Sequence, residues 1–345
     1  MKTGVDPLRE HIRVLYAKAN KTTDLEHSAC TCADAPPSFI AALQAKLPES
    51  VLAASYGCGT VMPSDYENLR GLRIADFAGG AGPDAYVLRL LAGRGGHVTN
   101  LDMTLEQLQK ARRYTTQFLK ENNLAPNSLI HRKGYMELAR GIGSGTMDLV
   151  VSNCVVNLSP DPRLVMQAKH RVLKIGGELY FSDVISDRRN DHLRDDPTLV
   201  AECIGRAPYE QDLRDAMLTA GFGDVREISR AVMTKPDQLK DDPATFYKVV
   251  WRAFKLPEMD TLCEDYGQFA IYNGNIKTSP TFFVFDDHHI FERDKPILVC
   301  RNTARMLDET RLAKSFTVSQ PIRHFGEFPC GPAPTGASGL EKSCC

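Results

Sequence analysis

The sequence has no excess of charge of one sign, and this limits the partners that it can have. Its 345 residues include 42 Lys and Arg against 43 Asp and Glu, so the formal net charge is −1. Proteins that bind nucleic acid or anionic membranes usually present a strong positive field. We therefore expect neither nucleic acid nor a membrane as a partner.

Long hydrophobic runs are also missing. The stretch from Met1 to Glu10 lacks an apolar segment of signal-peptide length, and no later run approaches the roughly 20 apolar residues of a membrane span. We therefore expect a cytoplasmic protein. Because disulfides are rare in a reducing cytosol, the ten cysteines are candidates for metal binding or catalysis, although cysteine is also a common buried apolar residue.

Changes of pattern divide the chain into four parts. With 43% hydrophobic and 25% charged residues the chain is globular, and it is too long for one comfortable core. We expect a helical N-terminal segment over residues 1–70, a ligand-binding domain over 71–234, a small α+β domain over 235–325 and a flexible cysteine-containing tail over 326–345.

From Leu72 onward, short apolar runs alternate with helical periods. The expected strands are Leu72–Ala78, His97–Leu101, Leu129–His131, Met147–Ser152 and Glu178–Ile185, and the expected helices are Asp84–Leu91, Leu105–Leu119 and Pro162–Leu173. This alternation predicts an α/β fold with a doubly wound, parallel, Rossmann-like sheet. The run Lys174–Gly177 is expected to end the last helix. We assign Phe246–Phe254, with Trp251, to the core of the small C-terminal domain.

A glycine-rich turn after the first expected strand predicts a cofactor site. The run Asp76-Phe77-Ala78-Gly79-Gly80-Ala81-Gly82-Pro83-Asp84 places Gly80 and Gly82 where the backbone can approach a ligand at a helix N-terminus. Asp102 ends the second expected strand and can accept hydrogen bonds from ribose hydroxyls. The same run also satisfies a dinucleotide fingerprint, and it can be read as a simple tight turn.

Charge favours one of these ligands. Asp76 would repel a pyrophosphate but suits the ammonium group of a methionine moiety. We therefore favour S-adenosylmethionine over a dinucleotide as the cofactor.

Three cysteines stand in unusual settings. Cys58 lies between two glycines, Cys154 follows the strand Met147–Ser152, and Cys203 lies on a segment that can fold over the same crevice. Thiolates that converge in this way favour a soft metal or metalloid. Their spacing matches no zinc-finger template. Cys30 and Cys32 form a further C-x-C source of thiols.

Several motifs together resemble the arsenite methyltransferase family, and the likeness runs from about Lys18 to Val318. They are Tyr56-Gly57-Cys58-Gly59, Asp102-Met103-Thr104, Gly134-Tyr135-Met136-Glu137, Ser152-Asn153-Cys154-Val155-Val156-Asn157-Leu158, Gly176-Gly177-Glu178-Leu179-Tyr180-Phe181-Ser182-Asp183-Val184, Glu202-Cys203, Cys263-Glu264-Asp265-Tyr266-Gly267-Gln268 and Asp286-Asp287-His288-His289.

The resemblance implies a class I methyltransferase domain that transfers a methyl group from S-adenosylmethionine to As(III), an arsenic-detoxifying reaction. It implies that arsenic is bound by Cys58, Cys154 and Cys203, with Cys30 as a fourth cysteine. It also implies that the cofactor is lined by Tyr56, Asp102, Met103, Met136, Glu137 and Asn153. The implied substrate is arsenite or its glutathione conjugate, and the implied reductants are glutathione and thioredoxin.

The sequence departs from the family pattern at four places. Ala78 replaces the first glycine of the loop and Pro83 replaces an arginine, whereas the family's E-C-L-G-G-A-L-Y carries Arg206 and Pro208 here. These changes keep three alternatives open: a weakly active or non-catalytic arsenic-binding paralogue, a methyltransferase of another small acceptor, and a NAD-dependent dehydrogenase.

Overall fold

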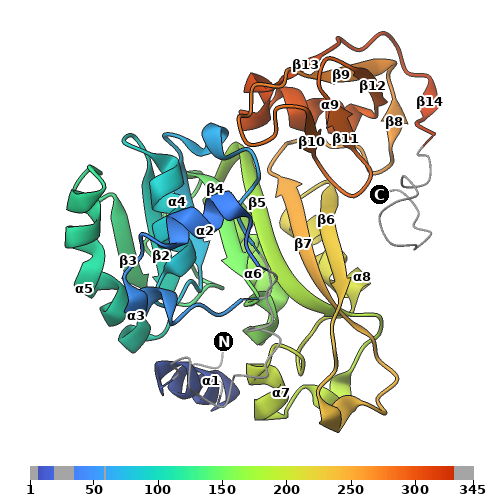
Figure 1. Cartoon of the computed structure of the whole chain (residues 1–345). Coiled ribbons are helices and arrows are strands. Elements are labelled where there is room, and N and C mark those ends of the chain that lie inside the picture. The colour runs from blue at the N-terminus through green and yellow to red at the C-terminus, as the bar shows by residue number, and fades with distance from the viewer. Residues whose placement is uncertain (1–6, 19–34, 58–59, 330–345) are drawn as a thin grey trace.

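The computed structural model describes residues 7–18, 35–57 and 60–329 (Figure 1). The predictions that concern Cys30, Cys32, Cys58 and residues 330–345 of the tail lie outside these described residues.

A seven-stranded sheet forms the centre of the molecule (Figure 1). Its strands are β1 Arg73–Phe77, β2 His97–Asp102, β3 Leu129–Lys133, β4 Met147–Asn153, β5 Leu173–Ser186, β6 Val225–Val232 and β7 Phe246–Phe254. They run in the order β3-β2-β1-β4-β5-β7-β6, and every strand is parallel to the others except β7, which is antiparallel to both of its neighbours. This is the Rossmann-like class I methyltransferase topology that the sequence predicts, with one antiparallel strand added.

Helices cover both faces of this sheet, because alternate residues of each buried strand point to opposite sides. On one face Ile74 and Leu149 pack with α4 (Pro83–Ala92) and α5 (Leu105–Glu121). On the other face Ala75 and Val150 pack with α6 (Pro162–Val172) and α8 (Glu210–Ala220). The expected doubly wound arrangement is therefore confirmed.

Two expectations about the sheet are wrong. Lys174–Gly177 does not end a helix; it lies within β5, which starts at Leu173 and contains a shift of register opposite Met147 and Leu149. Gly176 allows this irregularity because its φ is +77°. Phe246–Phe254 is not part of the C-terminal domain, because as β7 it pairs with β5 and β6 and buries Trp251 completely in the core of the main sheet.

The N-terminal helix α1 (Pro7–Lys18) crosses one end of the sheet and joins distant parts of the chain. The Gln107 side chain on α5 donates from Nε2 to the Tyr16 carbonyl oxygen (2.6 Å), and the Tyr16 hydroxyl donates to the Ala201 carbonyl oxygen on α7 (Pro197–Ala201; 3.1 Å). The next elements, α2 (Ser38–Gln44), α3 (Glu49–Leu52) and the 3₁₀ helix η1 (Tyr66–Leu69), follow before β1.

The C-terminal part is a small α+β unit at one end of the molecule (Figure 1). It contains β8 Glu264–Asp265, β9 Gln268–Tyr272, β10 Phe282–Val284, β11 Ile290–Glu292, β12 Pro296–Val299, α9 Arg301–Asp308, η5 Arg311–Lys314, β13 Phe316–Val318 and β14 Gly326–Glu327. Its largest sheet is antiparallel, in the order β12-β9-β13, and a separate apolar core lies beneath it.

A chain of buried charges joins this unit to the rest of the protein. Arg311 contacts Asp65, just before η1, and donates from Nε to Glu178 Oε2 on β5 (2.8 Å). Glu178 also accepts from Arg252 Nε on β7 (2.7 Å). All four side chains are buried, and we call them the charged seam.

Within the described ranges, none of the helices combines the length and the apolar character that crossing a bilayer requires.

Candidate active site

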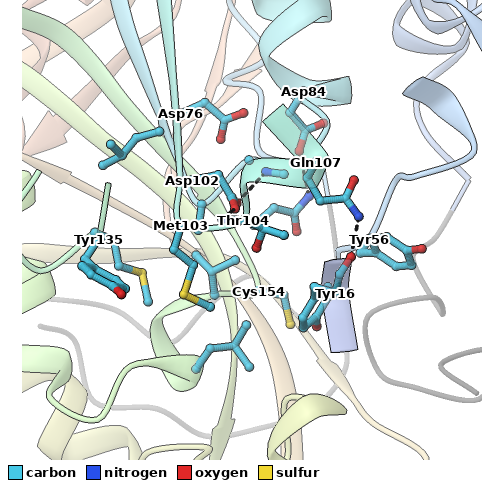
Figure 2. A pocket seen from close by; sticks show the side chains of 18 of the residues that line it. Tyr16, Tyr56, Asp76, Asp84, Asp102, Met103, Thr104, Gln107, Tyr135 and Cys154 are labelled. Carbon is cyan, nitrogen blue, oxygen red and sulfur yellow. Dashed lines mark hydrogen bonds between the residues drawn. The ribbon is translucent and has the colours of Figure 1, made fainter. Parts of the chain in front are cut away.

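A pocket opens where β1, β2 and β4 end, at the carboxyl edge of the parallel strands (Figure 2). Ligands of open α/β sheets bind at this edge. The aspartates gather on the side of the glycine turn, and the sulfur atoms of Met103 and Cys154 lie across the pocket from them. The predicted site residues that line it are Tyr56, Asp76, Gly80, Asp102, Met103, Met136, Glu137, Asn153 and Cys154. Gly82 and Cys203 are not among the lining residues.

The glycine turn follows the backbone geometry that its sequence requires. Gly80 and Gly82 have φ values of +54° and +82°, and Gly82 caps α4 in the left-handed conformation. Ala78 is also left-handed (φ +57°), so the alanine that replaces a family glycine is held in a conformation unfavourable for an L-residue. Pro83 opens α4, where its missing N–H leaves no helical hydrogen bond unmade.

Asp102 is fixed by the backbone around it. Its carboxylate accepts from the Gly80 N–H (2.9 Å) and from the Thr104 N–H (2.6 Å). Burial raises its pKa, and these hydrogen bonds oppose the rise. Since a carboxylate offers about four lone-pair sites, Asp102 keeps acceptor capacity for a ligand hydroxyl.

Asp76 is the strongest indication of a cationic ligand. It is buried, and its Oδ2 has no hydrogen-bond partner within the described part of the chain. Burial, followed by the charges of Asp84 and Asp102, raises the pKa of Asp76 well above its ordinary value. Burial also raises the pKa of Asp84, although the Asn153 amide donates to its Oδ2 (3.1 Å). A ligand ammonium group would satisfy this cluster of carboxyl groups.

The two described site cysteines lie together. Cys203 Sγ is 3.3 Å from the Cys154 carbonyl oxygen, and both side chains are buried. Each is left-handed, with φ of +57° at Cys154 and +65° at Cys203. The turn of Cys203 is held by the Asn157 amide, which donates to the Cys203 carbonyl oxygen (2.8 Å). Strained residues of this kind cluster at functional sites.

No larger metal-binding cluster is found in the described ranges, where nowhere do three His, Cys, Asp or Glu side chains gather as one set of ligands. The other two cysteines predicted to bind arsenic, Cys30 and Cys58, lie outside those ranges.

Sequence reasoning missed several residues of the pocket, namely Arg9, Tyr16, Asp84, Thr104 and Gln107. Arg9 and Tyr16 come from α1, where Arg9 pairs with Glu137 (2.8 Å) and Tyr16 meets the Tyr56 ring edge-on at 5.8 Å. The amphipathic period of α1 predicts a helix but does not say where the helix docks. Asp84 was within reach of sequence reasoning, since it ends the glycine-rich run and follows Asp76 onto the same turn.

Comparisons with known proteins agree with this geometry. Residues 68–221 match the family model described as a methyltransferase domain, and residues 267–336 match that of the arsenite methyltransferase C-terminal domain. An arsenite methyltransferase of Aquipseudomonas alcaligenes is 39% identical over 94% of this chain and 95% of its own length. The human arsenite methyltransferase is 32% identical over 97% of this chain and 88% of its own.

A solved structure gives the same result. An arsenic(III) S-adenosylmethionine methyltransferase from Chlamydomonas reinhardtii superposes with a TM-score of 0.80 at 37% identity, covering 85% of this chain and all of that one. The agreement extends over the main sheet and the C-terminal unit alike. The chain belongs to the arsenite methyltransferase family.

Proposed function

We propose that this protein transfers methyl groups from S-adenosylmethionine to As(III) held on its cysteine thiolates. The observation that carries the proposal is the pair of left-handed cysteines, Cys154 and Cys203, gathered beside a pocket whose buried carboxylate lacks a cation. The pocket geometry does not favour a dinucleotide, because Asp76 and Asp84 would repel a pyrophosphate.

The pocket residues suit the cofactor as follows. When bound, S-adenosylmethionine supplies an electrophilic methyl carbon for the lone pair of As(III). In our proposal Asp76 pairs with its ammonium group and Asp102 accepts from its ribose hydroxyls. Gly80 and Gly82 let the backbone come close. Around the remainder of the cofactor lie Tyr56, Met103, Met136, Glu137 and Asn153.

As(III) would exchange small thiol ligands for Cys154 and Cys203, with Cys58 or Cys30 completing a three-coordinate site. Soft thiolates suit a soft acceptor, and the protein mainly supplies proximity and orientation. No general base is needed, because the nucleophile is a lone pair and carries no proton. Each transfer oxidises arsenic formally by two electrons, so a thiol reductant must return it to As(III).

We further propose arsenite or its glutathione conjugate as the substrate, with glutathione and thioredoxin as the reductants. A reducing compartment such as the cytosol would keep the cysteines in the thiol form that this chemistry needs.

The test is incubation of the protein with arsenite, S-adenosylmethionine and a thiol reductant, followed by speciation of the arsenic. Cys154→Ser and Cys203→Ser should each lower methylation by about 100-fold or more, while binding of S-adenosylmethionine persists. The matched control is Cys300→Ser. Cys300 is a buried cysteine that caps α9, and serine can replace it in that cap. Near-normal methylation by Cys154→Ser or Cys203→Ser would contradict the proposal.

A further inference from the structure

A second cavity lies beyond the wall of the cofactor pocket. It encloses about 420 Å³ and is lined by segments that follow β4 and β5, by the turn after Cys203 and by the first part of α8. It therefore lies at the same carboxyl edge of the sheet, where ligands of this fold enter. Its volume falls within the roughly 300–1,000 Å³ of small-molecule sites.

The two cavities share a thin partition. Leu158 lines the cofactor pocket, whereas its neighbour Ser159 lines the second cavity. Two residues after Cys203, the turn contributes Gly205 and then Arg206 to that cavity. A ligand in the second cavity is thus within a few residues of the thiol that is proposed to take arsenic.

Arginine dominates the chemistry of this second cavity, which we call the arginine cavity. Four arginines and three aspartates line it. Three of the arginines form exposed pairs with these aspartates, namely Arg163–Asp161 at 3.2 Å, Arg189–Asp212 at 2.5 Å and Arg194–Asp191 at 3.7 Å. Exposed pairs of this kind contribute only about 0–1 kcal/mol, so a ligand carboxylate can compete for their guanidinium groups.

Arg206 is the fourth arginine, and it gives the lining one more guanidinium than carboxylate. Its Nε donates to the Arg194 carbonyl oxygen (3.3 Å), which places the side chain along the cavity wall. The N-terminus of α8 opens at the same place, and its N-cap Tyr209 makes no side-chain capping bond. The positive end of the helix dipole therefore adds to the attraction for an anion.

We propose that the arginine cavity binds the carboxylates of the thiol compound that delivers As(III), and that Arg206 selects carriers with carboxylates. This inference rests on the proposed function. In the delivery step the arsenic–sulfur bond to the carrier breaks as a bond to Cys203 Sγ forms, and the Cys203 proton leaves with the carrier thiolate. Arsenic stays trivalent throughout, so the exchange needs no oxidant or reductant.

The position of Arg206 makes the selectivity specific to this chain. The family pattern E-C-L-G-G-A-L-Y has glycine at this place, and a glycine offers no charge to a carboxylate. Pro208, the other departure in this turn, accepts from the Ser186 N–H at the end of β5 through its carbonyl oxygen (2.8 Å) and holds the turn against the sheet. The two changes together present a fixed guanidinium beside Cys203.

The test compares two thiols at equal concentration: glutathione, which has two carboxylates, and 2-mercaptoethanol, which has none. Arg206→Gly should raise the KM for arsenite about tenfold in glutathione, the effect of one charge-assisted hydrogen bond, and change it less than twofold in 2-mercaptoethanol. The kcat should stay constant in both thiols, and Arg206→Lys should recover part of the loss. Arg293→Ala, which removes an exposed arginine paired with Asp294 in the C-terminal unit, is the control.

A second measurement separates this proposal from the proposed function. S-methylglutathione carries the carboxylates but cannot bind arsenic, and calorimetry should show that it binds the wild type and binds Arg206→Gly about tenfold more weakly. Equal KM changes in both thiols, or no binding of S-methylglutathione, would overturn the role of the arginine cavity. Absence of methylated arsenic in both thiols, with S-methylglutathione still bound, would instead reject the proposed function.

Discussion

Cys203 Sγ lies 3.3 Å from the carbonyl oxygen of Cys154, although 48 residues separate the two cysteines in the chain. Each sits in a left-handed turn next to the end of a strand or helix of the main sheet. The sheet therefore brings together two sulfur atoms that no local motif would place side by side.

This pair predicts tight chelation of a trivalent phenylarsenical, which binds two thiolates. Replacing either Cys154 or Cys203 by Ser should weaken binding by about 100-fold, because the second thiol no longer acts at a high effective concentration. Competition with a small dithiol measures the affinity without any methyl transfer. Cys300→Ser should bind as the wild type does. Unchanged affinity in both site variants would show that other cysteines hold the arsenical.

Asp76 predicts a pH dependence of cofactor binding. Because burial and the nearby carboxylates of Asp84 and Asp102 raise its pKa, the cofactor-free folded protein holds a proton that the unfolded chain releases. The contribution of Asp76 to stability therefore falls as the pH rises through its folded pKa. A cationic ligand favours the ionised form, so affinity for S-adenosylmethionine should fall as the pH is lowered through the same range.

Asp76→Asn should weaken binding of S-adenosylmethionine by about tenfold or more, since a charge-assisted contact is lost. It should also flatten the pH dependence and leave the free energy of unfolding equal or higher at neutral pH. Titration calorimetry and urea unfolding at several pH values measure these effects. Asp294→Asn, at an exposed carboxylate, is the control. A wild-type pH profile in Asp76→Asn would remove Asp76 from the cationic site.

Ala78 predicts a gain of stability on mutation. Its φ of +57° costs an L-residue about 1–2 kcal/mol, and glycine avoids this cost. Ala78→Gly should therefore raise the free energy of unfolding by about 1 kcal/mol and lower the KM for S-adenosylmethionine. Ala81→Gly in the same turn should destabilise instead, because Ala81 is buried and does not have a positive φ. Equal effects at both positions would mean that the left-handed turn stores no strain.

Arg311 predicts a large loss of stability. Arg311→Met leaves Asp65 and one oxygen of Glu178 buried without their cation, which should cost about 3–5 kcal/mol in urea unfolding. Arg293→Met at an exposed pair should change stability by less than about 0.5 kcal/mol. Adding Asp65→Leu to Arg311→Met should recover part of the loss. If the double variant is no more stable than Arg311→Met, uncompensated charge is not the cause.

Most of the main sheet could be predicted from sequence because its strands are buried on both faces and their apolar runs are bounded by turns. The start of β5 could not, since Gly176 and Gly177 suggest a helix end and only pairing with β4 keeps them in a strand. β7 was assigned to the wrong part because its apolar pattern fits either core. In the candidate site, the glycine turn and Asp102 follow from local chemistry, whereas Arg9 and Tyr16 reach the pocket only through tertiary packing of α1.

The charged seam has a consequence for synthesis. Asp65 and Glu178 leave the ribosome long before Arg311, so the first of these acids waits in water while Arg252 can already serve the second. The interface closes only when nearly the whole polypeptide has emerged. A message cut short before codon 311 would yield a particle whose seam stays open at Asp65, a natural mark for cellular quality control.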